Sequence, residues 1–169
     1  MTPPDPTPAA PAIDSARFRQ VLGHFPTGVT VITAGASAGD RVGLAVGSFF
    51  SISLEPALVG FCAGKASSSW PKIREAGAFC VNILAADQEE ACRVFASKAD
   101  DKFDGIGYTP APYSGAPLLA DVLAWIDCEI DTIHDAGDHD IVVAKVHDLQ
   151  VTREGDPLVF FRGGYANLA

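Results

Sequence analysis

VGLAVGSFFSISLEP, residues 42–56, alternates bulky and small side chains with a period of two, which predicts an extended β-strand. One face of this strand is almost wholly bulky and apolar; its members are Val42, Leu44, Val46, Ser48, Phe50, Ile52 and Leu54. The other face is small except at Phe49; it holds Gly43, Ala45, Gly47, Ser51 and Ser53. We therefore expect one face to pack against a core and the other to be flat.

The flat face has two interpretations. Glycine has no side chain, so a planar ring system with polar edges would be able to approach the backbone closely. Alternatively, the glycines relieve crowding at a corner or bulge of a barrel. Taken alone, the stretch favours the packing interpretation, and the ring-binding interpretation stays open.

The segments around this stretch indicate a mainly β protein. Runs of β-branched and apolar residues predict further strands at 28–33, 57–62, 78–84, 122–134, 141–151 and 158–161. Six or seven strands with only short helices predict an antiparallel β-barrel with flanking helices rather than a doubly wound sheet. No GxGxxG motif follows a strand, which argues against a Rossmann dinucleotide site.

Three short helices are expected between the strands. Asp14 is placed to cap the first, whose apolar stripe of Phe18, Val21, Leu22 and Phe25 ends before a proline. A second helix begins after Ser69 and ends at Gly77. For the third, Asp87 and Glu90 have the spacing of a capping box. The polar segment 97–117 is expected to be an ordered excursion.

Length and composition limit the possible functions. The chain has 169 residues, of which 1–12 are proline-rich and predicted to be disordered, leaving one domain at 13–169. The formal charge is −9, from 21 acidic and 12 basic side chains, so nucleic acid and anionic membranes are not expected as partners. No apolar run approaches the ~20 residues that span a bilayer, and the N-terminus does not resemble a signal peptide.

The four cysteines are well separated and include no CxxC pair, so the sequence predicts neither a zinc site nor a disulfide framework. Reduced thiols fit a cytoplasmic protein. No triad order, HExxH motif or P-loop is present, and no metal site is expected. An enzyme with this sequence would take its reactivity from a bound cofactor.

An anion site is one interpretation of KASSS, residues 65–69, which places Lys65 and the hydroxyls of Ser67, Ser68 and Ser69 before a helix. Simple helix capping is the other interpretation. Lys102 is a second candidate cation.

Two turn motifs carry further candidates. In GDH, residues 137–139, His139 begins a strand and either hydrogen-bonds a ligand amide or bonds the backbone of its own turn. In FRGGY, residues 161–165, Arg162 has the forked donors that suit a phosphate or carboxylate, or it forms a surface ion pair.

Together these motifs resemble, in order, the short-chain flavin reductase family, the reductase components of two-component flavin-dependent monooxygenases. The resemblance covers nearly all of 18–168 and rests on seven segments: FPTGVTVIT, VGSFFSISLEP, GKASSSW, FCVNIL, DKF, GDHDIVV and PLVFFRGGY. It implies an FMN-binding split β-barrel, a six-stranded Greek-key barrel that forms homodimers with flavin near the interface.

The resemblance also implies an activity, in which NADH or NADPH reduces FMN or FAD for a partner oxygenase. It assigns the flavin to Gly43, Ala45, Gly47, Ser48, Phe49 and Ser51, with Lys65, Ser67, Ser69 and Lys102 near the ribityl phosphate. It assigns the nicotinamide side to His139, Arg162, Gly163 and Tyr165, with His139 orienting the nicotinamide. Alternatives are a flavin-binding module of the same fold without turnover and an enzyme like pyridoxamine-phosphate oxidase.

The sequence departs from the family pattern at three positions. Ala45 stands where threonine is common, Gly47 where asparagine or serine is common, and Phe50 where a small residue is common. Two side-chain hydrogen bonds to flavin are therefore expected to be missing, and the preference between FMN and FAD stays open.

Overall fold

The computed structural model describes residues 13–166, apart from 36–38, 40 and 100, together with residue 168. The prediction of a disordered tail at 1–12 lies outside these residues. The described part of the chain is mainly β, with three short α-helices and one 3-10 turn, η1 (Ala86–Gln88). The helices are α1 (Ser15–Leu22), α2 (Trp70–Ala76) and α3 (Glu89–Ala96). The strands are β1 (Thr27–Gly28), β2 (Thr30–Ala34), β3 (Val42–Val46), β4 (Phe50–Leu54), β5 (Ala57–Gly64), β6 (Ala78–Ile83), β7 (Tyr108–Pro110), β8 (Pro117–Leu119), β9 (Ala124–Ala136), β10 (His139–Val151), β11 (Val159–Phe161) and β12 (Gly164–Ala166).

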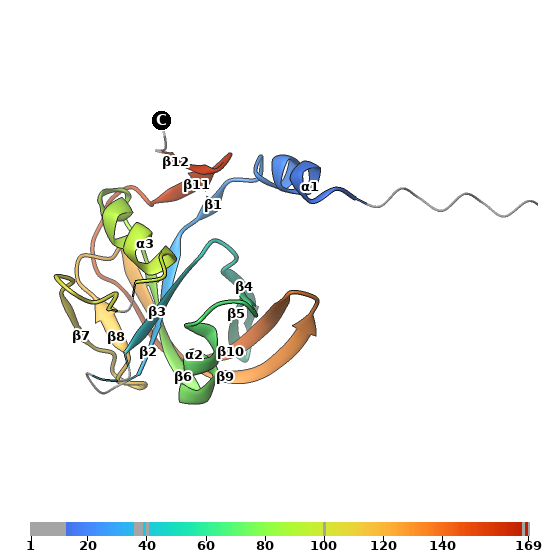
Figure 1. Ribbon diagram of the computed structural model, residues 1–169. Helices are drawn as coiled ribbons and strands as arrows, with labels where there is room; N and C mark the ends of the chain where they lie inside the picture. Colours follow the sequence, from blue (N-terminus) through green and yellow to red (C-terminus); the bar gives the residue numbers. More distant parts are fainter. Residues whose placement is uncertain (1–12, 36–38, 40, 100, 167, 169) are drawn as a thin grey trace, which may run out of the picture.

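Seven of these strands form one antiparallel sheet in the order β3-β2-β6-β9-β10-β5-β4. The long hairpin β9–β10 joins the β2–β3–β6 half of the sheet to the β4–β5 half, as Figure 1 shows. A register shift near Val143 and another near Val146 interrupt the pairing of β9 with β10. Such bulges increase local bend and twist. The predicted mainly β barrel is therefore confirmed, although its main sheet has seven strands rather than six.

The stretch 42–56 is two strands rather than one. β3 and β4 lie at opposite edges of the sheet and are joined by a turn at 47–49, so this short turn closes the barrel. Val42 and Val46 of β3 are buried as predicted, whereas Phe50 is 41% exposed and Leu54 is 95% exposed. The prediction of a continuous core face was wrong beyond the turn, because β4 pairs with β5 alone and its apolar side chains reach the surface.

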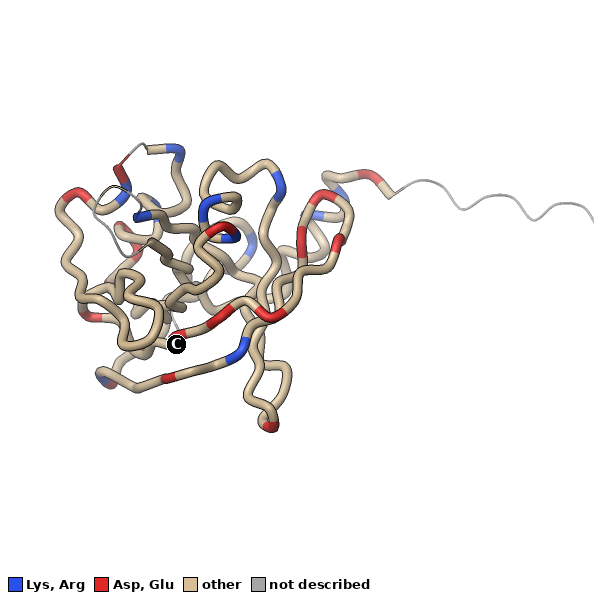
Figure 2. Tube along the Cα trace, turned by 90° about the horizontal axis from the view of Figure 1, so that it is seen from below, with Lys and Arg blue, Asp and Glu red and all other residues tan. Residues whose placement is uncertain are grey.

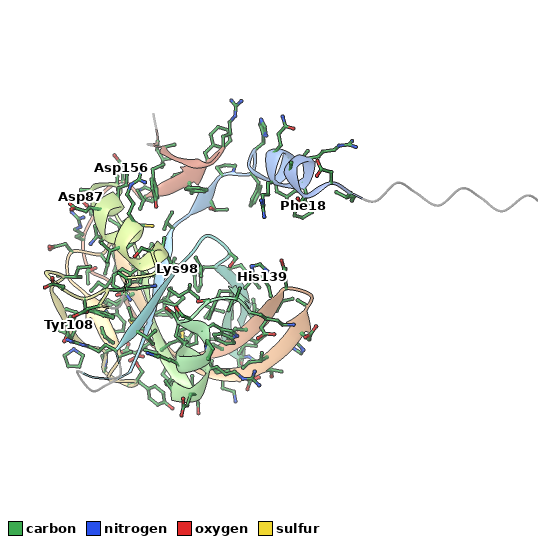
Figure 3. All side chains as sticks on the ribbon, viewed as in Figure 1. Phe18, Asp87, Lys98, Tyr108, His139 and Asp156 are labelled. Atoms are coloured by element: carbon green, nitrogen blue, oxygen red, sulfur yellow. The ribbon has the colours of Figure 1, made fainter. Side chains whose placement is uncertain are left out.

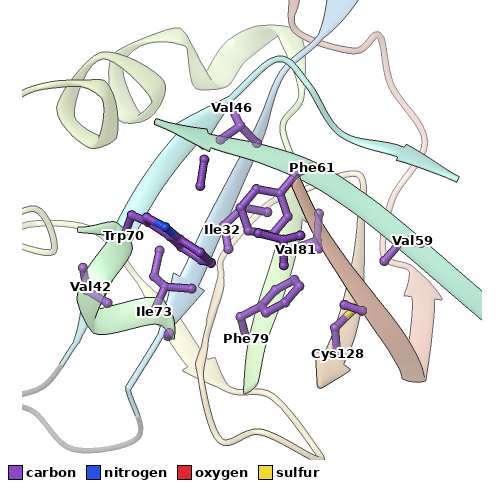
Figure 4. Packing of buried hydrophobic residues seen from close by; sticks show 14 residues of the cluster. Ile32, Val42, Val46, Val59, Phe61, Trp70, Ile73, Phe79, Val81 and Cys128 are labelled. Carbon is purple, nitrogen blue, oxygen red and sulfur yellow. The ribbon is translucent and has the colours of Figure 1, made fainter. Parts of the chain in front are cut away.

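The barrel interior holds the larger of two hydrophobic clusters, shown in Figure 4. Phe61 lies at its centre and makes edge-to-face contacts with Trp70 at 6.1 Å and with Phe79 at 5.4 Å between ring centroids. Trp70 and Ile73 come from α2, so this helix covers one opening of the barrel. The helix ends as predicted at Gly77, whose φ of 70° is left-handed and suits glycine.

A second cluster lies under α3 and the excursion 97–117. Phe95 of α3 is fully buried and contacts Phe103 at 5.1 Å between ring centroids. The buried carboxylate of Asp127 accepts hydrogen bonds from the backbone N–H groups of Tyr113 and Ser114. The described part of this excursion is therefore ordered, as predicted.

The start of α3 differs from the predicted capping box. The Gln88 side chain, not Glu90, accepts a hydrogen bond from the Ala85 N–H at 3.1 Å. Asp87 instead accepts from the Arg153 guanidinium at 2.5 Å, and this bond lowers the pKa of Asp87. The Asp87 carboxylate therefore forms a long-range ion pair with Arg153 instead of the helix cap that the local pattern predicted.

The N-terminal helix α1 begins as predicted, because the Asp14 side chain accepts from the N–H groups of Ala16 and Arg17. It ends at Leu22 rather than after Phe25, and among the described residues its apolar stripe meets no core, since α1 has no buried residue. Phe18 is 52% exposed and Phe25 is 74% exposed. Figure 1 shows α1 beside the barrel rather than on it. Among the described helices, none is both long and apolar enough to cross a membrane.

Candidate functional site

A cleft of about 450 Å³ lies where β3 turns toward β4, and we name it the seam cleft. The end of α1, strand β1 and strand β11 form one side of it, and the ends of β3 and β5 form the other. Its lining residues are Leu22, Gly23, Phe25, Thr27, Leu44, Ala45, Val46, Gly47, Ser48, Cys62, Gly64, His139 and Phe160.

Ser48 fastens the two sides of the barrel at this cleft. Its hydroxyl donates to the carbonyl of Cys62 at 3.1 Å and accepts from the Cys62 N–H at 2.9 Å. These two hydrogen bonds from one side chain replace backbone pairing between the β3–β4 turn and β5. Ser48 was predicted to bind a cofactor, and in this structure its hydroxyl is occupied by the backbone.

The predicted flat face is divided between two roles. Ala45 and Gly47 border the seam cleft, and a Cβ at Gly47 would come within 2.8 Å of the Thr27 hydroxyl. Gly43 does not border it, because the ring of Phe95 lies where a Cβ would be, at 2.3 Å. Gly43 thus makes room for the ring of Phe95, and its assignment to flavin stays a prediction.

Two other residues predicted to bind flavin lie away from the cleft lining. Phe49 packs against the barrel core, and Ser51 is exposed on β4. In this arrangement neither contributes a wall to the seam cleft. Phe49 is part of the turn after β3, and Ser51 is part of the edge strand that follows this turn.

His139 is in the seam cleft, at the first residue of β10, as predicted. Its Nδ1 lies 2.7 Å from the Asp138 carboxylate, which assigns the proton to Nδ1 and leaves Nε2 as an acceptor toward the cleft. The same contact lowers the pKa of Asp138. A Cβ at the opposite residue, Gly64, would come within 3.5 Å of Nε2, so the glycine keeps room beside the ring.

Arg162 and Gly163 of the FRGGY segment, which were predicted to lie on the nicotinamide side, do not line the seam cleft of one chain. Arg162 and Gly163, with φ of 51° and 81°, form the turn between β11 and β12, and the Arg162 N–H donates to the Gly23 carbonyl at 2.8 Å. Within one chain neither residue lines the cleft. The neighbouring Phe160 lines it instead, a residue the sequence reasoning did not select.

Tyr165 lies behind the cleft rather than in it. Its hydroxyl is 3.1 Å from the thiol of Cys92, and the Arg93 guanidinium lies 4.8 Å from its ring centroid. Burial is the main cause that raises the pKa of Tyr165 to about 12. This tyrosine fastens strand β12 to α3.

A second cavity, of about 180 Å³, lies at the start of β3, and we name it the basic pocket. Four cations and two hydroxyls are among its lining residues: Arg41, Lys72, Lys98, Lys102, Ser68 and Ser69. The sequence reasoning selected Lys102 and Ser69 but missed the other basic residues. Lys72 follows the N-cap Ser69 by three residues, and residues at this spacing lie on one side of a helix. This spacing could have predicted that Lys72 lies beside Ser69.

Lys102 is held at the inner end of the basic pocket. Its ammonium donates to the carbonyls of Phe95 at 2.9 Å and Gly43 at 3.2 Å, and to the Ser69 hydroxyl at 3.4 Å. Burial lowers the pKa of Lys102. The lysine thus joins β3, α3 and the start of α2 around a partly desolvated positive charge.

Lys65 and Ser67 are not part of this pocket. The Lys65 ammonium is bonded to the carboxylate of Asp135, which raises the pKa of the lysine, and it donates to the Gly137 carbonyl at 2.7 Å. The Ser67 hydroxyl accepts from the N–H groups of Ser69 and Trp70. The cap predicted at Ser69 is therefore supplied by Ser67, because the Ser69 side chain makes no capping hydrogen bond, and Lys65 binds the turn of the β9–β10 hairpin.

Strand β3 connects the two cavities. Its residues Val42 and Gly43 border the basic pocket, and Leu44, Ala45 and Val46 border the seam cleft. At roughly 3.3 Å per residue the strand covers about 13 Å from end to end. Among the described residues, no group of three or more His, Cys, Asp and Glu side chains is arranged to hold a metal.

The chain matches the model of the family described as "Flavin reductase like domain" over residues 22–169. A flavin reductase of Pseudomonas putida is 49% identical over 158 residues, covering 94% of this chain and 92% of that protein. The reductase subunit HsaB of a flavin-dependent monooxygenase from Rhodococcus jostii is 49% identical over 160 residues, covering 95% of this chain and 81% of that subunit.

Solved structures agree with these sequence matches. A nitrilotriacetate monooxygenase component B from Mycobacterium thermoresistibile has a TM-score of 0.87 and 45% identity, over 91% of this chain and 86% of that one. The NADH:FAD oxidoreductase SgcE6 of Streptomyces globisporus has a TM-score of 0.86 and 34% identity, over 96% of this chain and 99% of that one. The split β-barrel is therefore confirmed, and the chain belongs to the flavin reductase-like domain family.

Proposed function

We propose that this protein is an NAD(P)H:flavin oxidoreductase that supplies reduced flavin to a partner monooxygenase. The observation that carries the proposal is the placement of two cavities along one strand. A flavin has a flat ring at one end and a phosphate at the other, and β3 offers a small-walled cleft and a basic pocket about one strand length apart.

The residues present fit such a ligand. Ala45 keeps its wall of the seam cleft low, Gly47 lets the Thr27 hydroxyl lie close to the same wall, and Phe160 offers an aromatic wall for a ring. Exposed lysine and serine side chains in the basic pocket are donors suited to a phosphate, and Lys102 adds a positive charge whose own donors bind the protein. This pocket is basic in a chain whose formal charge is −9, so the local cations overcome the overall repulsion of an anion.

A flavin held by the seam cleft and the basic pocket would supply the redox chemistry of hydride transfer from a nicotinamide. The chain contributes position and shielding from water. His139, with its proton held on Nδ1 by Asp138, presents Nε2 as an acceptor for the carboxamide N–H₂ of nicotinamide. No side chain of the cleft is required as a nucleophile.

The same proposal includes a homodimer, a monooxygenase partner and a cytoplasmic location. The apolar side chains of α1 are exposed in one chain, and the end of α1 lines the seam cleft, so a second copy would cover these side chains and add a wall beside the cleft. Relatives from Rhodococcus jostii and Acinetobacter baylyi are named as reductase components of monooxygenases. The four cysteines are free, which supports a reducing compartment.

The test is NADH oxidation with FMN or FAD, followed by absorbance, in the parent protein and in Gly47→Leu. A leucine at 47 projects into the seam cleft and toward Thr27, so flavin-dependent oxidation is expected to fall to background while circular dichroism stays close to the parent's. Ala57→Leu, at an exposed strand position outside the cleft, is the matched control and should keep full activity. Unchanged oxidation by Gly47→Leu would place the ring elsewhere. Flavin binding by the parent without NADH oxidation would favour a flavin-binding module.

A further inference from the structure

The basic pocket holds more positive charge than one phosphate needs. Four of the chain's twelve Lys and Arg residues border a cavity of about 180 Å³, and no described acidic residue lines it. Blue segments gather in the upper half of Figure 2, whereas red segments follow much of the outline. Cations grouped in this way repel one another, and a bound anion relieves that repulsion.

The inner end of the pocket has enough polar groups to bind one phosphate without the outer residues. Lys102 and Ser69 are bonded to each other beside Gly43, where they offer one partly buried charge and one hydroxyl next to β3. This is a position for the phosphate nearest the flavin ring, because the seam cleft begins at the next residue of the strand. Ser68, which is exposed, adds a hydroxyl at the same wall.

The outer end of the pocket has a second pair of cations. Lys72 comes from α2, one turn after Ser69, and Lys98 lies two residues beyond the end of α3. Figure 3 shows Lys98 between these two helices. Both lysines are exposed, and no ion pair among the described residues engages either of them.

Arg41 has a different role at the wall of the pocket. Its guanidinium lies 5.5 Å from the ring centroid of Phe103 and 5.0 Å from that of Tyr108. These two rings fix the arginine in place, so it shapes the wall rather than following a ligand. The cations free to reach outward are therefore the lysines that come from the two helices.

We propose that the basic pocket binds a diphosphate, so that this protein prefers flavin adenine dinucleotide over flavin mononucleotide. The inference rests on the proposed flavin reductase function and assigns its substrate class. The inner phosphate lies at Lys102, Ser69 and Ser68, and the outer phosphate lies between Lys72 and Lys98. The mononucleotide ends at the inner phosphate and leaves the outer lysines without a ligand.

The experiment measures the dissociation constants of FAD, FMN and riboflavin by titration in the parent, Lys72→Ala, Lys98→Ala and the double variant. The double variant is expected to weaken FAD binding roughly tenfold to hundredfold, since each lost charge-assisted hydrogen bond costs about a factor of three to ten here. FMN binding should weaken less than about threefold, and riboflavin should not respond. ADP should compete with FAD in the parent more strongly than AMP does.

Lys145→Ala is the control, because it removes the same charge from a surface lysine that pairs with Asp131, outside both cavities. It should leave all three dissociation constants unchanged. Equal losses for FAD and FMN in the double variant would overturn the diphosphate assignment and leave a single-phosphate pocket. No loss for either would exclude these lysines from flavin binding. Failure of the parent to bind any flavin would instead overturn the proposed function itself.

Discussion

Gly43 and Phe95 lie so close together that any side chain at 43 must displace the ring. A Cβ there would be 2.3 Å from the ring of Phe95, which is fully buried. We expect Gly43→Ala to lower the free energy of unfolding by about 1–3 kcal/mol, the usual cost of overpacking a core. Urea unfolding measures this change. Gly28→Ala, where a Cβ meets nothing within 4 Å, is the control, and Gly43→Ala/Phe95→Leu should recover part of the loss. Equal stability of Gly43→Ala and the parent would disprove the close contact.

His139 is the residue that we propose to contact the nicotinamide carboxamide. If Nε2 accepts one hydrogen bond from the carboxamide, His139→Ala should raise the Michaelis constant for NADH about threefold to tenfold and change turnover less, because one neutral hydrogen bond is worth roughly 0.5–1.5 kcal/mol. Steady-state kinetics with NADH varied at saturating flavin measures both constants. A fall in turnover of about a hundredfold with an unchanged Michaelis constant would make His139 a proton donor instead.

At the scale of elements, local patterns predicted most of what is local. The strand expected at 78–84 is β6 (Ala78–Ile83), and the helix expected between Ser69 and Gly77 is α2. The departures from local patterns come from partners distant in the chain. Asp87 binds Arg153 instead of capping α3. Lys65, whose assignment to the phosphate stays a prediction, is bonded to Asp135, which is 70 residues away in the chain. No periodicity records such pairs, because they exist only after the barrel has closed.

In the candidate site, too, the residues placed by local patterns were predicted, and those placed by contacts between distant elements were missed. His139, Ala45 and Gly47 lie in the seam cleft, because strand alternation and a turn motif fix where they point. Phe160 was missed, since its place in the cleft depends on β11 pairing with β1. Lys98 was missed because it reaches the basic pocket through the packing of α3 on β3. The family resemblance supplied the flavin, which the residues alone left open.

For the whole molecule, we expect a homodimer that buries the apolar side chains of α1. Burying one large apolar side chain contributes about 1.5–3 kcal/mol, and a charge in its place opposes association. Sedimentation velocity should show a dimer for the parent at micromolar concentration, a monomer for Phe18→Asp/Val21→Asp, and a dimer for the control Gln20→Asp on the same helix. A monomeric parent with flavin bound would rule out the expected assembly.

The seam cleft also bears on how long a ligand stays. Its walls at Phe25 and Gly47 are exposed, so a molecule enters and departs without parting any pair of hydrogen-bonded strands. The residence time of the ligand then depends on its contacts with the cleft and not on any opening of the barrel. With an association rate of about 10⁶ M⁻¹ s⁻¹, a dissociation constant near 1 μM allows release about once per second. A typical enzyme turnover of about ten per second therefore requires reduced flavin to be held no more tightly than about 10 μM. A cleft that opens to solvent beside the β3–β4 turn suits an enzyme that must release its reduced flavin after every cycle.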